Sequence, residues 1–357
     1  MNDSVRRPLY ILGAGFSKAL HEHMPITNDL GNDVAELFKK QKHRKCGYEK
    51  EESFEDWLSM ASQELPYLDS SENRQRAADL QLMLSLIATV IEQRSQSLES
   101  APPWLTTLIS RWNSEQARII TFNYDMLLEK SINMVRPTIK LNGKDHKLYG
   151  DEVVFPRPQT DLAGTWKEQS IQSAKEGSMQ IMKLHGSLNW YWAPDDQIGQ
   201  TLRRIPVRKG LGEQDVDVNH STSGLERFLI PPLSGKSAYY RPYLTRALWC
   251  DALAAVRHAE SITFMGYSLP MTDRVTVELL KMSQSPLHVN IVDLHADAKQ
   301  DDSLQKRIGK IVKCSDIRTF SGKSCIEEFV NNQRSPEHEE PDATSTDTEP
   351  PASPTAP

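Results

Sequence analysis

Five short apolar segments of this chain each end in a small or polar cluster, and this pattern constrains the fold most. The clusters are Gly13-Ala14-Gly15, Asn123-Tyr124-Asp125, His185-Gly186-Ser187, Gly266-Tyr267-Ser268 and Asp293. Apolar runs bounded by turn residues are typical of buried parallel strands. In a doubly wound sheet the carboxyl ends of such strands share one edge, where ligands bind. We therefore expect an α/β, Rossmann-like parallel sheet with a ligand crevice at that edge.

Large insertions separate these strands. Apolar residues recur at helical spacing from about Asn28 to Arg94 and again near Trp104, which predicts a helical insertion over about 32–115. Residues 136–178 and 193–228 carry proline and glycine with little periodicity, so we expect irregular insertions there, the first with room for a hairpin. We expect one domain over 1–334. Residues 335–357, rich in Pro, Ser, Thr and acidic side chains, are expected to be a disordered tail.

Composition narrows the function classes. The net charge is −6, and six acidic residues and one arginine in the last 24 residues leave the rest of the chain at about −1. The net charge therefore gives no indication that the chain binds nucleic acid directly or lies on a membrane surface. The four cysteines form no CxxC pair, which argues against a disulfide framework and against zinc. We expect a cytoplasmic protein without signal peptide or membrane span.

The first cluster is a glycine turn between a strand and a helix. Backbone N–H groups in such a turn can approach a pyrophosphate closely. The turn is not a full GxGxxG motif, because Lys18 stands at the third glycine position. A glycine turn without a ligand is the alternative. Asp293, at the end of a late strand, could accept from ribose hydroxyls, and a solvated carboxylate is the alternative there.

The polar residues at the other strand ends also allow two interpretations. His185 precedes Gly186, so its imidazole can project into the crevice, or it can be a hydrogen-bonded core histidine. Asn123 and Asp125 are candidate site residues, but both types are also common helix caps. The apolar stretch Leu80 to Ile91 is a candidate contact face for self-association, with ordinary core packing as the alternative. We expect Trp190 in the core and Trp192 as a loop anchor.

The motifs GAGFS, TFNYD, KLHGS and GYSLP occur in this order and resemble the sirtuin-type NAD-binding signature. The longer forms KLHGSLNW and GYSLPMTD are most similar to the sirtuin-like NAD-hydrolysing domain of bacterial antiviral (antiphage) defence systems. The resemblance spans Gly13 to Asp273 and does not cover the insertions. It implies a sirtuin-like fold that binds NAD+ as a substrate.

The resemblance also implies residue roles. The turn that begins at Gly13 and the GYSLP loop would contact the NAD+ phosphates. The residues implied are Ala14, Gly15, Ser17, Gly266 and Ser268. Asn123 and His185 would flank the nicotinamide ribose, with Asp125 toward the carboxamide. Phe122 replaces the glutamine of the usual sirtuin motif, and the zinc-binding cysteine pairs of protein deacylases are absent. Both departures argue against deacylation.

We therefore expect an NAD+ glycohydrolase (NADase) effector of antiphage defence that releases nicotinamide and ADP-ribose. Asn123 would position the water and His185 would act as general base, since an imidazole with an unperturbed pKa of about 6.5 suits that role. By analogy with defence operons, we expect a homo-oligomer held inactive until triggered by a HerA-like ATPase, an Argonaute-type protein or a phage component. A non-catalytic NAD or ADP-ribose-binding assembly module and an NAD-dependent protein deacylase are the alternatives.

Overall fold

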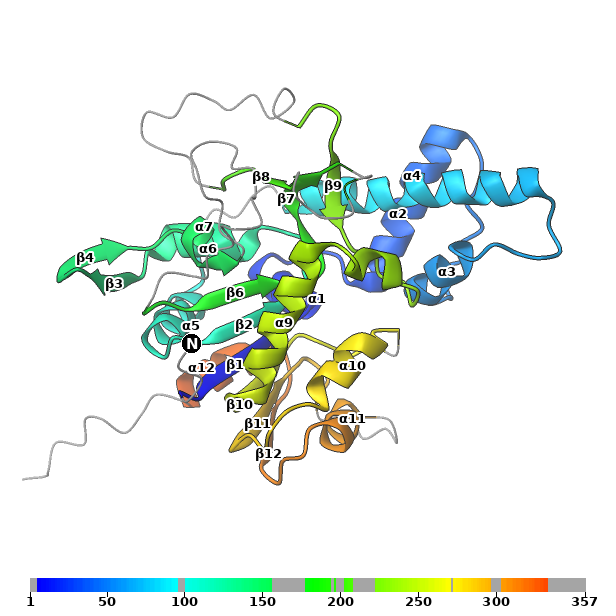
Figure 1. Ribbon diagram of the computed structural model, residues 1–357. Helices are drawn as coiled ribbons and strands as arrows, with labels where there is room; N and C mark the ends of the chain where they lie inside the picture. The colour runs from blue at the N-terminus through cyan, green and yellow to red at the C-terminus, as the bar shows by residue number, and fades with distance from the viewer. Residues whose placement is uncertain are drawn as a thin grey trace, which may run out of the picture.

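The computed structural model of this chain describes residues 5–95, 100–155, 177–193, 196, 202–207, 222–270, 272–296 and 303–332. Its centre is a seven-stranded sheet with the order β12-β11-β10-β1-β2-β6-β5 (Figure 1). All neighbouring strands of this sheet pair in parallel. The strands are β1 (Arg7–Leu12), β2 (Arg118–Thr121), β5 (Val154–Phe155), β6 (Gln180–Lys183), β10 (Ala259–Met265), β11 (His288–Val292) and β12 (Ile317–Phe320).

The strand order is that of a Rossmann-like sheet with one added edge strand. From β1 the chain builds outward through β2 and β6, and then returns to the other side of β1 to add β10, β11 and β12. The strand order therefore reverses between β1 and β10, and ligands of open α/β sheets bind outside the carboxyl ends at such a switch point. The predicted fold class is confirmed.

Helices cover both faces of this sheet. In Figure 1, α9 (Tyr243–Arg257) crosses the face toward the viewer, and its apolar side packs on β1 and β6. On the opposite face, Trp112 of α5 (Pro103–Ser114) and Phe329 of α12 (Cys325–Asn332) both contact the ring of Tyr10. The remaining helices of the sheet are α1 (Ala14–Leu20), α6 (Leu127–Val135), α7 (Gly150–Val153), α10 (Arg274–Leu280) and α11 (Leu304–Ile311).

A helical insertion between β1 and β2 lies beyond the carboxyl ends of the strands (Figure 1), and it covers only part of the predicted range 32–115, because α5 packs on the sheet. It contains α2 (Thr27–Lys42), α3 (Phe54–Ala61) and α4 (Ser70–Arg94), and β2 and β6 point toward it in Figure 1. Six apolar side chains of α4 are buried in the main core: Met83, Leu86, Ile87, Ala88, Val90 and Ile91. The stretch Leu80 to Ile91 therefore packs in the core, which was the alternative to a contact face for self-association.

The two irregular insertions are only partly within the described residues. The first contains the hairpin β3 (Thr138–Leu141) and β4 (Lys144–Lys147), while residues 156–176 lie outside the description. The second was predicted to be loop, and this was wrong for two short strands, β8 (Arg203–Arg204) and the start of β9 (Glu226–Leu229). They pair with β7 (Gly186–Trp192) in a three-stranded antiparallel sheet of order β8-β7-β9. The predicted tail, 335–357, also lies outside the described residues.

Gly186 explains how the chain passes from β6 into β7. Its φ is +83°, and an added Cβ would lie 2.1 Å from the carbonyl oxygen of Phe228 on β9. Only glycine tolerates both the backbone conformation and this close approach. Downstream, Trp190 is fully buried as predicted, and Trp192 ends β7 with its ring edge-on to Phe228.

Candidate active site

The five clusters at the strand ends lie along one edge of the sheet. The register aligns Leu12 with Thr121 on one side and with Met265 on the other, and it extends this alignment to Lys183 and Val292. Each cluster begins directly after, or two residues after, one of these aligned positions. The predicted convergence of the five strand ends is therefore confirmed, and it surrounds the switch point between β1 and β10.

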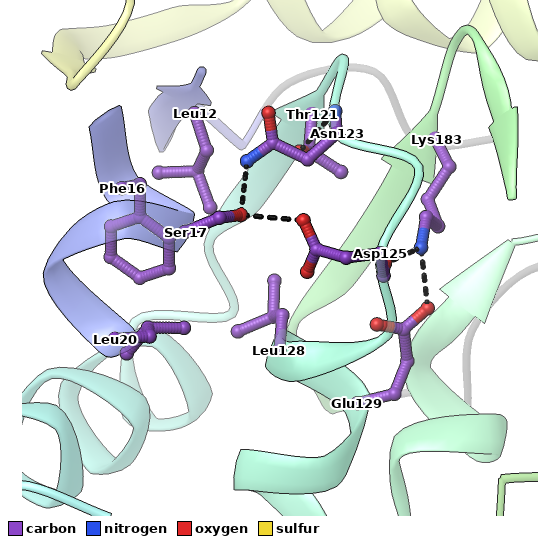
Figure 2. A pocket seen from close by; sticks show the side chains of 10 residues that line it. All are labelled: Leu12, Phe16, Ser17, Leu20, Thr121, Asn123, Asp125, Leu128, Glu129 and Lys183. Carbon is purple, nitrogen blue, oxygen red and sulfur yellow. Dashed lines mark hydrogen bonds and ion pairs between the residues drawn. The ribbon is translucent and has the colours of Figure 1, made fainter. Parts of the chain in front are cut away.

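The first polar cluster joins the glycine turn to the Asn-Tyr-Asp segment (Figure 2). The Asn123 amide donates from Nδ2 to the Gly13 carbonyl oxygen at 2.8 Å and to Ser17 Oγ at 2.9 Å. Ser17 Oγ in turn donates to Asp125 Oδ2 at 2.7 Å. Asp125 Oδ1 accepts from the N–H of Leu127, the first residue of α6, although the N-cap residue of that helix is Met126.

A buried ion pair supports this cluster from β6. Lys183 Nζ lies 2.9 Å from Glu129 Oε1 and also donates to the Asp125 carbonyl oxygen. Both charged side chains are at most 2% exposed. Burial raises the pKa of Asp125, and the Lys183 ammonium and the Ser17 hydroxyl oppose that rise. Together with Leu12, Phe16, Leu20, Thr121 and Leu128, these residues line a small cavity (Figure 2).

His185 belongs to a second polar cluster. Its imidazole is buried, and its ring centroid lies 4.9 Å from that of Phe122. The ring contacts the ammonium group of Lys236, whose Nζ lies 3.4 Å from His185 Nε2. Burial and the Lys236 ammonium lower the pKa of His185 to about 3, while Asp273 acts in the opposite direction. The pKa of His185 therefore departs from the ordinary imidazole value that was expected for the base.

Sequence reasoning missed most of this second cluster. Lys236 Nζ lies 3.4 Å from Asp273 Oδ1, and the Tyr267 hydroxyl donates to Asp273 Oδ2 at 2.9 Å. Burial raises the pKa of Asp273, but His185, Lys236 and Tyr267 together hold it below its usual value. Asp273 ends the GYSLPMTD segment, so that motif was the available signal for it. Lys236 stands in a loop with no periodicity, where no pattern pointed to it.

The helical insertion reaches this second cluster. Thr272, next to Asp273, donates a hydrogen bond to the carboxylate of Glu55 in the first turn of α3. Burial raises the pKa of Glu55, and the hydrogen bond from Thr272 and the charge of Lys236 oppose that rise. A carboxylate from the insertion therefore stands beside the ion pair that faces His185.

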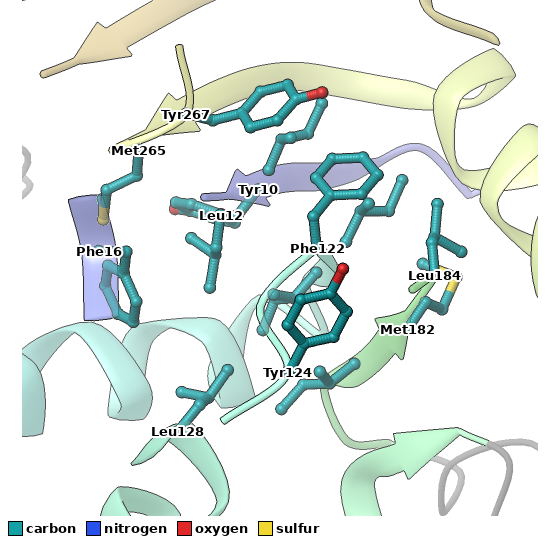
Figure 3. Packing of buried hydrophobic residues seen from close by; sticks show 14 of the residues in the cluster. Tyr10, Leu12, Phe16, Phe122, Tyr124, Leu128, Met182, Leu184, Met265 and Tyr267 are labelled. Carbon is teal, nitrogen blue, oxygen red and sulfur yellow. The ribbon is translucent and has the colours of Figure 1, made fainter. Parts of the chain in front are cut away.

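Aromatic rings pack beside the second cluster. Phe122 stacks on Tyr267, with ring centroids 4.8 Å apart and planes 22° apart (Figure 3). The Tyr124 hydroxyl donates to the Ile230 carbonyl oxygen at 2.6 Å. Among the described residues no hydrogen bond joins the side chains of Asn123 and His185. These two residues stand on neighbouring strand ends, but their side chains contact different groups.

The glycines of the first turn serve close backbone packing. The Gly15 N–H donates to the Gly266 carbonyl oxygen at 3.0 Å, and an added Cβ on Gly13 would lie 2.5 Å from the same oxygen. Gly266 has a φ of +59°, and a Cβ there would lie 2.3 Å from the backbone nitrogen of Phe16. Packing between the β1–α1 turn and the β10 loop therefore accounts for the glycines, and phosphate binding by the turn stays a prediction.

The other predicted binding residues lie at the outer part of the edge. Ala14 is half-buried in the first turn of α1. Ser268 is exposed, and its carbonyl oxygen accepts from the guanidinium of Arg307 at 3.0 Å. Asp293 follows β11 and accepts from the His295 N–H at 3.0 Å. No side-chain hydrogen bond among the described residues links these three to Asn123 or His185.

Comparisons with known proteins give distant structural likenesses only. No family model matches the chain, and no curated protein matches it. A Sir2 structure with the inhibitor EX-527, 2′-O-acetyl-ADP-ribose and a deacetylated p53 peptide is 12% identical, with a TM-score of 0.35 and 92% of each chain covered. A Sir2 point mutant with a p53 peptide and NAD is 11% identical, with the same TM-score and coverage. A structure on sirtuin substrate affinity is 12% identical, with a TM-score of 0.34, over 92% of this chain and 93% of that one.

Two general features complete the description. Within the described ranges, no helix is long and apolar enough to cross a membrane. The same ranges contain no group of three or more His, Cys, Asp or Glu side chains arranged to hold a metal ion.

Proposed function

We propose that this chain is an NAD+ glycohydrolase that converts NAD+ and water into nicotinamide and ADP-ribose. The observation that carries the proposal is the hydrogen-bonded cluster of Ser17, Asn123 and Asp125 at the switch point of the sheet. Its members come from the GAGFS and TFNYD motifs, and His185 of KLHGS follows the neighbouring strand. Motifs resembling one NAD-binding signature thus fall at the part of the fold where nucleotides bind.

The chemistry of these side chains suits the proposed substrate. An amide, a hydroxyl and a carboxylate recognise sugar hydroxyls, a carboxamide and water through directed hydrogen bonds. Asn123 is well held, because its Nδ2 is fixed on Gly13 and Ser17. Its Oδ1 has no partner within the described residues and is available to accept from a water molecule. Asn123 is therefore suited to orient the attacking water.

In the proposed reaction the bond between the ribose C1′ and the nicotinamide nitrogen breaks. Its electron pair goes to the ring nitrogen, which loses its positive charge, and the water oxygen bonds to C1′. The water gives up one proton to a base, for which His185 is the candidate. Holding water and sugar in a fixed arrangement supplies much of the rate enhancement in reactions of this kind. We assign the nicotinamide end to the strand ends of β2 and β6.

We further infer, from the resemblance to antiphage defence domains, that hydrolysis is restrained until a trigger arrives. The proposed effector is a cytoplasmic homo-oligomer whose partner is a HerA-like ATPase, an Argonaute-type protein or a phage component. Contact between α3 and the Thr272–Asp273 segment supports a link from the helical insertion to the site. A trigger that binds the insertion would therefore act close to the second polar cluster.

Product analysis tests the function. The purified chain, alone and with the protein encoded next to it, is incubated with NAD+, with and without an acylated peptide. We expect nicotinamide and ADP-ribose without peptide. Peptide-dependent release of nicotinamide with an acyl-ADP-ribose product would instead indicate a deacylase. NAD+ that is retained but unchanged in every mixture would indicate a binding module, and either result would overturn the proposal.

A further inference from the structure

A buried ammonium group stands beside the imidazole that the proposed reaction uses as its base. Lys236 Nζ lies 3.4 Å from His185 Nε2 and 3.4 Å from Asp273 Oδ1. The Lys236 and Asp273 side chains are 6% and 4% exposed. A lysine is rarely buried to this degree without a partner, and here the partner is a carboxylate that is itself hydrogen-bonded to Tyr267. The arrangement is therefore a built cluster.

The hydrogen-bonding chemistry of this cluster determines how His185 carries its proton. A lysine ammonium has three donors and no acceptor. An imidazole nitrogen within hydrogen-bond distance of it must act as acceptor. His185 Nε2 therefore presents its lone pair to Lys236, and the single proton of the neutral ring is on Nδ1.

We propose that Lys236, held by Asp273, is a positioning residue that fixes the tautomer of His185 and covers its Nε2 lone pair. His185 then becomes an effective base only when the ammonium group withdraws. This inference rests on the proposed function in assigning His185 the role of base. It goes beyond that function by naming the group that controls the base.

A second carboxylate close to Lys236 could accept its ammonium group. Lys236 stands on the segment between β9 and α9, and its four-carbon stem allows the charged end to move without unfolding the loop. The Glu55 carboxylate on α3 interacts with the charges of Lys236 and Asp273. Tyr124, Tyr240 and Tyr267 are further titratable groups that interact with the charge of Asp273. A shift of Lys236 toward Glu55 would expose the His185 lone pair.

The two charged partners act on His185 in opposite directions, and this makes the inference testable. Lys236 lowers the pKa of His185, and Asp273 raises it. Removal of the ammonium by Lys236→Met should therefore raise the pKa of His185. Removal of the carboxylate charge by Asp273→Asn should not raise it. If Lys236 and Asp273 only stabilised the fold, the two substitutions would not change the pKa of His185 differently.

The experiment follows the His185 ring by nuclear magnetic resonance in protein labelled at histidine, with its signals assigned by comparison with His185→Gln. In the wild type we expect the Nδ1–H tautomer and no titration between pH 5 and 8. In Lys236→Met we expect the midpoint at least one pH unit higher than in the wild type. Lys281→Met, which removes an exposed lysine paired with Glu278, is the control and should match the wild type.

Each outcome decides the inference without using NAD+. An Nε2–H tautomer in the wild type would overturn it, and this measurement needs no variant to fold. A wild-type midpoint near 6.5, or an unchanged midpoint in folded Lys236→Met, would also overturn it. If the tautomer and shifts are as expected but no variant hydrolyses NAD+, the proposed function fails while the control of His185 by Lys236 stands.

Discussion

Ser17 Oγ donates a hydrogen bond to Asp125 Oδ2 at 2.7 Å, and this bond joins two motifs that lie 108 residues apart. We expect Ser17→Ala to destabilise the protein by about 1–3 kcal/mol, because it leaves a buried carboxyl oxygen without its donor. Urea unfolding measures the loss. The control is Thr89→Ala, which removes an exposed hydroxyl bonded within α4 and should cost less than about 0.5 kcal/mol. Equal stability of Ser17→Ala and wild type would contradict the role of this bond.

The buried Lys183–Glu129 pair should behave as one unit. Lys183→Met leaves the Glu129 carboxylate buried without its cation, and we expect a loss of about 3–5 kcal/mol. The double variant Lys183→Met/Glu129→Gln should lose less than the single one, because no buried charge is left unpaired. A double-mutant cycle by urea unfolding measures the coupling. Strictly additive losses would show that the two charges do not depend on each other.

Close packing of the first turn predicts a specific glycine requirement. Gly13→Ala places a Cβ 2.5 Å from the Gly266 carbonyl oxygen, so we expect a loss of about 1–3 kcal/mol from overpacking. Gly235→Ala is the matched control, because the nearest atom to its added Cβ is 3.9 Å away. Thermal unfolding of both variants compares them. A Gly13→Ala protein as stable as Gly235→Ala would mean that the turn can move away from β10.

Burial of His185 predicts a pH dependence of stability. Its pKa falls from about 6.5 in the unfolded chain to about 3 in the folded protein, so the unfolded chain binds more protons between these values. The stability contribution of the neutral ring is complete above about pH 6.5 and is lost as the pH falls toward 3. We expect His185→Gln to lose less stability than wild type between pH 7 and pH 5, by urea unfolding. Parallel pH curves for the two proteins would be inconsistent with a depressed pKa.

The parallel sheet could be predicted because each of its central strands is a buried apolar run followed by turn residues. Burial on both faces makes the pattern of Ile119–Thr121 or Val289–Val292 unmistakable. The sheet β8-β7-β9 could not be predicted in the same way. Its strands are short, and the positive φ of Gly186 redirects the chain within one residue, which apolar patterning does not record.

The site residues that stand at strand ends could be predicted together with those strands. Asn123, Asp125 and His185 lie within four residues of the ends of β2 and β6, so their placement followed from the sheet. Lys236 and Glu55 reach the same region from a loop and from the helical insertion, and only tertiary packing brings them there. The lowered pKa of His185 follows from its burial and from the Lys236 ammonium, and both depend on tertiary packing that the sequence does not reveal.

The central claim is that Asn123 and His185 carry out hydrolysis of NAD+. The most direct measurement is the rate of nicotinamide release by wild type, Asn123→Ala, His185→Ala and the exposed control Lys281→Met, each shown to be folded and assayed with the same partner. We predict a loss of at least about 100-fold in each site variant and an unchanged rate in the control, since a lost general base and a misplaced water each cost about this much or more. Site variants that release nicotinamide at the wild-type rate would contradict the claim.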